Sequence, residues 1–359
     1  MIAKGLEGIT VDETKISLVD GESGTLAYRG HPIDDLVDRP FDEVAALVAT
    51  GACDTNFAAQ LATAGELSQR ETRLIQQLPR TLHPMHVLQG ITPLLDPAEA
   101  FSEHGLAAQG FAIAAKLPAI VATHMLGKPT AAQEPSYTDR FLGMIGTELT
   151  PVARRAFAVT QILQIEHSFN ASSFAARVTA STLAPVQNAL STGFGTLHGV
   201  LHGGADQAAL ETAERVGSPD RAKAFVDQCI ADKRRVMGMG HREYRVLDPR
   251  ARHIKRIAAE VSHGTPHEVT FQTLLAIEAR FAERMAEKNK QLHANVEFYK
   301  GVVYRVLGLT PQYFTAGFAM ARVFGYLAHF IESREGNRLI RPAARYIGPP
   351  VARRCPTPA

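Results

Sequence analysis

The amino-acid sequence predicts a mainly α-helical fold that begins with one short β-hairpin. Alanine is abundant, and apolar residues recur at spacings of three and four along most of the chain, which is the periodicity of helices with one buried face. No alternation of strand and helix patterns occurs, so a Rossmann-type sheet is not expected. The hairpin is predicted from two strand-like runs, Ile16–Val19 and Thr25–Tyr28, which flank the turn-rich segment Asp20–Gly24.

The predicted helices are separated by proline and glycine, which interrupt the helical pattern. The expected breaks lie at Pro84, Gly90–Pro93, Pro118, Pro151, Pro185 and Pro249. The predicted helical segments are 43–50, 58–78, 106–126, 151–166, 173–190, 205–216, 268–288 and 313–331.

Length and composition are those of a soluble globular protein with two domains. The chain has 359 residues, of which 45% are apolar and 21% are charged. The net charge is +2 and no long run of Lys or Arg occurs, so neither nucleic acid nor a membrane surface is expected as a partner, although an anionic small molecule is. The first residues lack an apolar signal core, and no apolar run approaches 18 residues. We therefore expect a cytoplasmic protein without a membrane span.

The cysteines do not indicate a disulfide framework or a structural zinc site. Cys53, Cys229 and Cys355 lie far apart in the sequence, and none belongs to a CxxC pair. This usage suits a reducing cytosol.

A glycine-rich segment, 193–204, is the first candidate functional region. Five glycines in twelve residues are unusual in a packed helix and suit backbone that approaches a ligand. The helical pattern of 205–216 follows directly, so His202 is expected beside a helix N-terminus, where the helix dipole disfavours imidazolium. A neutral histidine there could donate a hydrogen bond to a developing oxyanion. Two alternatives remain: incidental histidines in a flexible loop, and a metal site through His198 and His202, which no HExxH motif or third ligand supports.

A second candidate region, 237–250, contains His241 between a glycine turn and several arginines. The histidine is suitably placed to meet an anion that carries a carbonyl group, and the planar guanidinium of Arg250 matches a carboxylate. Taken alone, however, this segment is more typical of a solvated basic loop.

Three further polar residues interrupt apolar segments. Arg322 lies in the apolar helix 318–327, where burial of an unpaired guanidinium is costly, so it must meet a protein carboxylate, reach the surface or bind an anionic ligand. His167 lies in the polar interruption 166–172, where a hydrogen-bonded core histidine is the usual case. Glu297 is flanked by apolar residues, a setting that suits a general base, although an exposed helical glutamate is commoner.

Taken in order, these segments resemble the citrate synthase family. The family's usual bacterial forms are DHELNAST, GPLHGGAN, MGFGHRVY, DPRA, NVDFYSG, FAxxR and RPxxxYxG. The corresponding segments of this chain are 166–172, 199–206, 237–244, 248–251, 295–301, 318–322 and 341–348. The N-terminal stretches 5–9 and 26–30 are also similar, so the resemblance extends over almost the whole chain, although 50–140 match less distinctly.

The resemblance implies a two-domain, mostly helical fold and a homodimer. Residues 1–206 and 314–359 would form the large domain, and residues 207–313 a smaller domain that closes over the substrates. The implied reaction condenses acetyl-CoA with oxaloacetate and hydrolyses citryl-CoA, without a metal or redox cofactor.

The resemblance also implies roles for individual residues. His202 corresponds to the histidine that hydrogen-bonds the thioester oxygen, His241 to the histidine on the oxaloacetate ketone, and Glu297 to the family's aspartate base. The implied oxaloacetate-binding residues are His167, Arg250, Arg322 and Arg341, the last reaching the partner subunit's site, and the implied CoA-binding residues are Arg245 and Lys255.

Departures from the family forms leave the function open between alternatives. Glu297 replaces the usual Asp, Asp206 the usual Asn and Lys300 the usual Ser. The extra methylene of Glu297 moves the carboxylate by roughly 1 Å, which can lower a rate by about 100-fold. The alternatives are 2-methylcitrate synthase, which uses propionyl-CoA, and a non-catalytic paralogue that binds CoA or a dicarboxylate.

Overall fold

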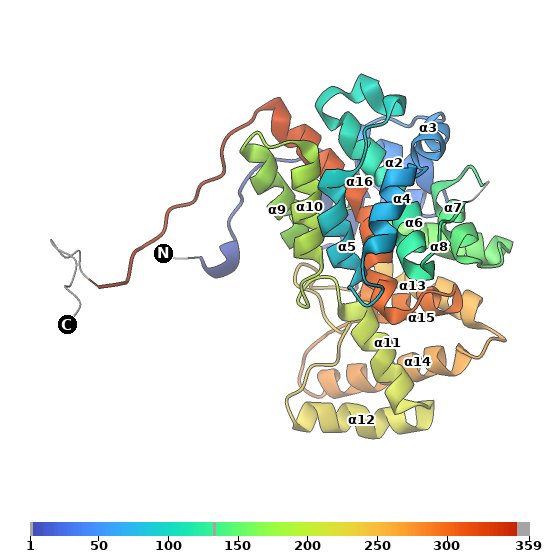
Figure 1. The fold of residues 1–359 in the computed structure, drawn as a ribbon. Helices are drawn as coiled ribbons and strands as arrows, with labels where there is room; N and C mark the ends of the chain where they lie inside the picture. The colour runs from blue at the N-terminus through green and yellow to red at the C-terminus, as the bar shows by residue number, and fades with distance from the viewer. Residues whose placement is uncertain (1–2, 132–133, 350–359) are drawn as a thin grey trace, which may run out of the picture.

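The computed structural model describes residues 3–131 and 134–349, which form a mainly helical fold with one small sheet (Figure 1). The sheet is antiparallel in the order β1-β2-β3, with Ser17 opposite Tyr28. Its strands are β1 (Ser17–Asp20), β2 (Thr25–Tyr28) and β3 (His31–Pro32). The predicted N-terminal hairpin and the mainly α fold class are therefore confirmed, and the sheet gains a third, two-residue strand.

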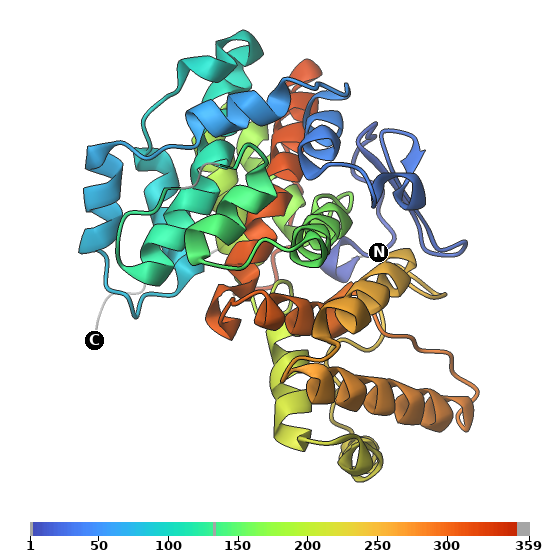
Figure 2. The same cartoon turned by 90° about the vertical axis from the view of Figure 1, so that its right-hand side faces the viewer.

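Two groups of helices can be followed in Figures 1 and 2. The first group is built around α16 and contains α1 (Ile33–Leu36), α2 (Phe41–Thr50), α3 (Phe57–Ala64), α4 (Gln69–Gln77), α5 (Pro84–Ile91), α6 (Ala108–Leu126), α7 (Tyr137–Ile145), α8 (Pro151–Gln164), α9 (Ala171–Ser181), α10 (Val186–Leu197) and α16 (Phe314–Glu335). The second, called here the α11–α15 group, contains α11 (Ala205–Val216), α12 (Pro219–Ala231), α13 (Pro249–Ser262), α14 (Glu268–Ala286) and α15 (Val296–Val306). Short 3-10 helices lie at Lys4–Leu6, Thr92–Leu94, Glu99–Ala107 and Pro311–Tyr313.

Helix α16 forms the centre of the first group because it is apolar on almost every side. It packs against α2, α6, α8, α9 and α10, and its residues from Phe314 to Phe330 are buried. Burying apolar surface from both sides of one helix is the main source of stability in such an arrangement.

Two helical stretches reach the length and hydropathy of a membrane span. They are Glu99–Leu126 and Pro311–Glu335, and 78% and 94% of their apolar windows are buried inside the protein. Helices that are covered by other helices on most sides are core helices of the fold, so these stretches do not indicate a membrane span.

In the α11–α15 group, α12 packs against α14, and α15 packs against both α11 and α13 (Figure 2). Helices α13 and α15 also contact α8 of the first group. The N-termini of α11, α13 and α15 are therefore close to the first group, and the residues just before and after these N-termini build the candidate site.

Most predicted helices are present, and the exceptions have clear local causes. The segments 58–78 and 173–190 are each interrupted, because Gly65–Ser68 separates α3 from α4 and Thr182–Pro185 separates α9 from α10. The expected break at Pro118 was wrong, because this proline lies inside α6. A proline cannot donate to the carbonyl four residues earlier, and here the Tyr137 hydroxyl donates to that carbonyl, of Ala114, over 3.1 Å.

The glycine-rich segment was also partly misassigned to a loop. Gly193 and Gly195 lie within α10, and the loop begins only at His198. A Cβ atom at Gly193 would lie 2.7 Å from the Tyr326 ring, and one at Gly195 would lie 2.5 Å from the Gln89 amide. These two glycines therefore allow close helix packing, whereas those at 199, 203 and 204 belong to the loop before α11.

Candidate active site

His202 lies in the short loop between α10 and α11, directly before the helix that begins at Ala205. Its Nε2 atom is 2.7 Å from the Ser172 hydroxyl and accepts the Ser172 backbone N–H over 3.3 Å. Burial, followed by the charge of Arg322, lowers the pKa of His202 to about 4. The ring is therefore neutral at pH 7, and because Nε2 is an acceptor, the proton is on Nδ1.

The cap of helix α9 places Ser172 against His202. The Asn170 side-chain oxygen accepts the backbone N–H of Ser173 at the N-terminus of α9 and lies 2.8 Å from the Ser172 hydroxyl, whose proton points to Nε2 of His202. Helix α9 and the loop before α11 are thus joined at one point, which fixes the plane of the imidazole ring.

His241 and Arg250 form the second part of the site. The Nδ1 atom of His241 accepts the backbone N–H groups of Glu243 and Tyr244 over 3.0 and 3.3 Å, so the neutral ring carries its proton on Nε2. That Nε2 atom lies 3.3 Å from NH2 of Arg250, which can only donate. Burial and then Arg250 lower the pKa of His241 to about 4. Two donors therefore lie side by side and can share one ligand oxygen.

Asp248 holds Arg250 in place. Its carboxylate accepts Nε and NH2 of Arg250 over 2.9 Å each, a bidentate pair, and it also caps α13 by accepting the Arg250 backbone N–H over 3.0 Å. Both side chains are buried. The second region is therefore a structured buried site, and the alternative of a solvated basic loop is wrong for these residues.

Arg322 is a buried guanidinium that lacks such a partner. Its Nε atom donates to the Gln164 main-chain oxygen over 2.8 Å, and its guanidinium lies 4.7 Å from the centre of the Phe318 ring. Among residues 3–131 and 134–349, no carboxylate oxygen lies within 4.0 Å of a guanidinium nitrogen of Arg322, so the arginine forms no ion pair there. A buried cation that is satisfied only in part is a binding site for an anion.

His167 lies between these groups and joins the two histidine regions. Its Nε2 atom is 3.1 Å from the Tyr244 hydroxyl, and its ring centre is 5.4 Å from that of His241. Burial, followed by the charges of Arg250, His241 and Arg322, lowers the pKa of His167 well below its usual range. His167 thus lies beside His241 and within the influence of both guanidinium charges.

Glu297 lies in the first turn of α15, close to the loop that carries His241. Its backbone N–H donates to the side chain of Asn295, which caps α15, and the Asn295 amide donates to the Gly240 carbonyl over 2.9 Å. An isolated bridge joins Met239 to Ala294 in the same region. The Glu297 carboxylate is mostly buried and is paired with Lys300 at 2.6 Å. It is therefore not an exposed helical glutamate.

The three remaining predicted residues lie outside the cluster formed by the histidines, arginines and glutamate described above. Arg245 is exposed, and its nearest acidic partner is Glu22 at 4.0 Å. Lys255 pairs with Glu278 at 2.6 Å and lies over the Tyr299 ring. Arg341 is exposed in the extended segment that follows α16 and runs away from the body of the chain (Figure 1).

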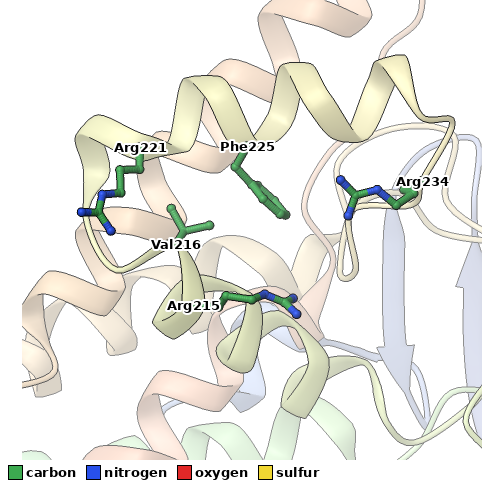
Figure 3. A pocket seen from close by; sticks show the side chains of 5 residues that line it. All are labelled: Arg215, Val216, Arg221, Phe225 and Arg234. Atoms are coloured by element: carbon green, nitrogen blue, oxygen red, sulfur yellow. The ribbon is translucent and has the colours of Figure 1, made fainter.

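Two hollows accompany the site. A small one is lined by His241, Tyr244, Arg245 and Asp248 and by the segment 291–294, and it adjoins the pocket described above. A larger one of about 370 Å³ is lined by Arg215, Val216, Arg221, Phe225 and Arg234 (Figure 3). Arg215 lies near the C-terminal end of α11, and His202 precedes its N-terminus. Because α11 has 12 residues, roughly 15–18 Å of helix separates this arginine hollow from the histidine.

Metal-ligand geometry is not found in the described part of the chain, where no group of three His, Cys, Asp or Glu side chains is arranged to hold an ion. The alternative of a metal site through His198 and His202 therefore has no support from a third ligand. His198 instead stacks on His83, with ring centres 4.2 Å apart.

Several residues of the site were not assigned a role from the sequence. Ser172 and Asp248 orient predicted residues, and both lie in recognised motifs next to helix N-caps, so the caps were a usable signal. Gln164 meets the site only through contacts between distant segments, which no local pattern indicates. Tyr244 and Lys300 also contact His241 and Glu297 three residues earlier, a spacing that was a usable signal.

Known proteins share the sequence pattern and the fold of this chain. The family model described as citrate synthase, C-terminal domain, matches residues 5–343. This chain belongs to the citrate synthase family. Within that family, the citrate synthase of Deinococcus radiodurans is 34% identical over 97% of this chain and 96% of its own length. The 2-methylcitrate synthase of Mycobacterium tuberculosis is 36% identical over 97% of this chain and 91% of its own length.

Solved structures of family members share the fold. The citrate synthase of Thermotoga maritima is 33% identical, with a TM-score of 0.88 over 99% of this chain and 98% of that chain. The citrate synthase of Thermoplasma acidophilum, solved in a ternary complex with carboxymethyl coenzyme A and oxaloacetate, is 27% identical, with a TM-score of 0.90 over the same shares. The resemblance seen in the sequence and the expected citrate synthase fold are both confirmed.

Proposed function

We propose that the protein condenses acetyl-CoA with oxaloacetate and hydrolyses the resulting citryl-CoA to citrate and CoA. The observation that carries this proposal is a cluster in which Arg322, a buried guanidinium without an ion-pair partner among the described residues, acts on the neutral histidines 167 and 202, with His241 beside His167. We refer to this cluster as the pocket. A dicarboxylate that carries a ketone satisfies such a pocket. Family membership and relatives named citrate synthase support the same assignment.

The proposed chemistry begins at the acetyl thioester. Glu297 removes a proton from the methyl carbon, while Nδ1–H of His202 donates to the thioester oxygen and stabilises the enol. The enol carbon then attacks the ketone carbon of oxaloacetate, whose oxygen accepts from Nε2–H of His241 and from Arg250. Water finally cleaves the thioester and releases CoA. Each step uses a proton or donor of this chain, and we propose that no metal or redox cofactor takes part.

We further propose that oxaloacetate is bound by His167, Arg250 and Arg322 together with Arg341 of a second subunit. Arg341 is exposed on a segment that leaves the body of its own chain, a position from which it could reach the site of a second subunit. Arg245 and Lys255 are proposed for CoA, although Lys255 would first have to release Glu278.

The proposed domain division follows from the same function. Residues 1–206 and 314–359 would form the large domain and residues 207–313 the small one. Residues 1–2, 132–133 and 350–359 of the large domain lie outside the described structure. Because His202 and Arg322 fall in the first part and His241, Arg250 and Glu297 in the second, closure would complete the site and exclude water. We place the protein in the cytoplasm.

The test is the release of free thiol from acetyl-CoA in the presence of oxaloacetate, followed with a thiol reagent. We expect release that depends on both substrates. Absence of release with retained binding of oxaloacetate would instead favour the non-catalytic paralogue.

A second candidate function is 2-methylcitrate synthesis from propionyl-CoA. The identity to the Mycobacterium tuberculosis enzyme of that name, 36%, is as high as the identity to relatives named citrate synthase. One methylene in a pocket changes specificity by only about 1–3 kcal/mol. Comparison of kcat/KM for acetyl-CoA and propionyl-CoA decides between the two, and a preference for propionyl-CoA would replace our first assignment.

A further inference from the structure

Lys300 is a fully buried cation beside the proposed base. It lies one turn after Glu297 on α15, and its side chain is 0% exposed. Its Nζ atom is 2.6 Å from Oε2 of Glu297, 3.2 Å from Oδ2 of Asp206 and 3.0 Å from Oε1 of Gln164. An ammonium group has three N–H donors, and these three oxygens match them in number.

The charges in this cluster depend on one another. Burial alone would lower the pKa of Lys300. The carboxylates of Asp206 and Glu297 outweigh burial and hold this pKa above its usual range, and Tyr304 is the other titratable neighbour. Burial raises the pKa of Asp206, and Glu297 adds to that effect, while Lys300 opposes it. Removal of the ammonium would leave two carboxylates close together in a buried site, which is strongly unfavourable.

Lys300 also connects the base to the anion pocket. Gln164, which accepts from Lys300 with its side chain, accepts from Arg322 with its main-chain oxygen over 2.8 Å. The Phe318 ring lies between the two cations, 4.3 Å from Nζ of Lys300 and 4.7 Å from the Arg322 guanidinium. The α11–α15 group and the first group of helices therefore meet through Lys300.

The three ionised members of the cluster are three positions at which this chain departs from the usual family forms. Asp206 stands for Asn, Glu297 for Asp and Lys300 for Ser. In the structure these separate departures are in direct contact. Glu297 is the longer base, Lys300 is the cation that reaches it, and Asp206 is a second carboxylate that balances the charge of Lys300. We interpret the three departures as one change in which each added charge is balanced by another.

We propose that Lys300 is a positioning residue for Glu297: it holds the Oε2 atom of the longer side chain and so directs Oε1 towards the acetyl methyl group. Within the described residues, the ion pair with Lys300 at 2.6 Å is made by Oε2, which has no hydrogen-bond partner besides this charge contact. The glutamate with its lysine thus replaces the shorter aspartate found in the usual form. This inference rests on the proposed function, because it assigns a geometry to the same base.

The main test compares Lys300→Met with a matched control, Lys116→Met. Lys116 is also a buried lysine, paired with Glu71 at 2.7 Å, but it lies on α6, away from the site. For Lys300→Met we expect kcat to fall by about 30- to 100-fold, because a carboxylate displaced by about 1 Å loses that much rate. We expect the KM values for oxaloacetate and acetyl-CoA to change by less than about threefold, since both substrates are held by other residues.

The deuterium isotope effect on kcat, measured with acetyl-CoA deuterated at the methyl group, separates positioning from general loss of structure. It should increase in Lys300→Met, because proton removal becomes slower relative to the other steps, and should not change in Lys116→Met. An unchanged isotope effect with kcat within about threefold of the parent would overturn the proposal. So would a change confined to the KM for oxaloacetate.

A second variant keeps the test informative if Lys300→Met does not fold. Lys300→Met combined with Asp206→Asn removes one charge of each sign, so Glu297 is no longer next to another buried carboxylate. This variant should fold, and it should still show the low kcat and the raised isotope effect. Full activity in the double variant would show that Lys300 serves only to neutralise Asp206, and the positioning role would be wrong.

Failure of the proposed function can be recognised separately. If the parent protein releases no thiol with either acyl-CoA, the proposed function fails, and the contact itself is then tested by urea unfolding of Lys300→Met, Glu297→Gln and their combination. A combined shift in midpoint smaller than the sum of the single shifts supports a direct hold of Lys300 on Glu297. Additive shifts would show that the two side chains do not act together.

Discussion

The two ends of the site use buried charge in opposite ways. At the anion end, Arg322 is buried without an acidic partner, and Arg250 has Asp248 as its buried counter-ion. At the base end, Lys300 donates to Gln164 and forms ion pairs with Glu297 and Asp206. The anion end therefore lacks negative charge until a ligand supplies it, whereas the base end holds its own counter-charges and, in our proposal, positions the reacting group.

The strongest test of this contrast is Glu297→Gln at the base end. We expect thiol release to fall by about 1,000-fold, because the amide cannot accept the methyl proton. Oxaloacetate affinity, measured by calorimetry, should remain within about threefold, since the anion end is unchanged. Glu211→Gln on the exposed face of α11 is the control and should leave both quantities unchanged. Normal turnover in Glu297→Gln would remove this residue from the base role.

At the anion end, Arg250→Met should mainly lower stability. The substitution leaves the Asp248 carboxylate buried without its bidentate partner, which should reduce the free energy of unfolding by about 3 kcal/mol. Urea denaturation measures this loss. Addition of Asp248→Asn should restore part of it, and a double variant as unstable as the single one would show that the pair contributes little.

Arg322→Met should have the opposite pattern: stability should change little, and oxaloacetate binding should weaken. The arginine forms no ion pair among the described residues, and Glu166, the carboxylate whose charge acts on it, keeps its contact with His329, so the unfolding free energy should change by less than about 1 kcal/mol. The KM for oxaloacetate should rise by about 100-fold, because a charge-assisted contact to a buried carboxylate is lost. A large loss of stability in this variant would erase the contrast between the two arginines.

The smallest expected effect concerns pH. Burial, together with Arg322 for His202 and Arg250 for His241, lowers the pKa of each ring to about 4, against about 6.5 in the unfolded chain. The folded protein then binds fewer protons between these values, so the stability from the neutral rings is complete above about pH 6.5 and is lost as the pH falls towards 4. Melting temperatures between pH 7.5 and 4.5 should fall, and less steeply in His202→Asn. Identical slopes of melting temperature against pH in the parent and in His202→Asn would contradict the lowered pKa of His202.

The sequence alone predicts the residues that we propose to touch substrate better than the residues that hold them. His202 was expected before a helix N-terminus because the pattern of 205–216 follows it, and this placement is confirmed. Arg322 was left with three alternatives, and burial without a carboxylate favours an anionic ligand. The pairing of Lys300 with Asp206 spans 94 positions of chain, and no periodicity encodes such a contact.

Errors in the predicted fold arise where tertiary contacts override local preference. Pro118 remains inside α6 because Tyr137 satisfies the carbonyl that proline leaves free. Gly193 and Gly195 remain helical because α10 packs closely against Tyr326 and Gln89. In both cases the deciding partner is distant in sequence, so propensity alone gave the wrong boundary.

The position of α16 has a consequence for how the chain is made. This helix is buried on nearly every side by α2, α6, α8, α9 and α10, yet the ribosome adds it after about 310 residues. The last of the enclosing helices, α10, ends at Leu197 and α16 begins at Phe314, so at roughly 5–20 residues per second the apolar groove stays uncovered for on the order of 6–23 s during synthesis. The enclosing helices must therefore avoid aggregation without their central element until α16 has emerged.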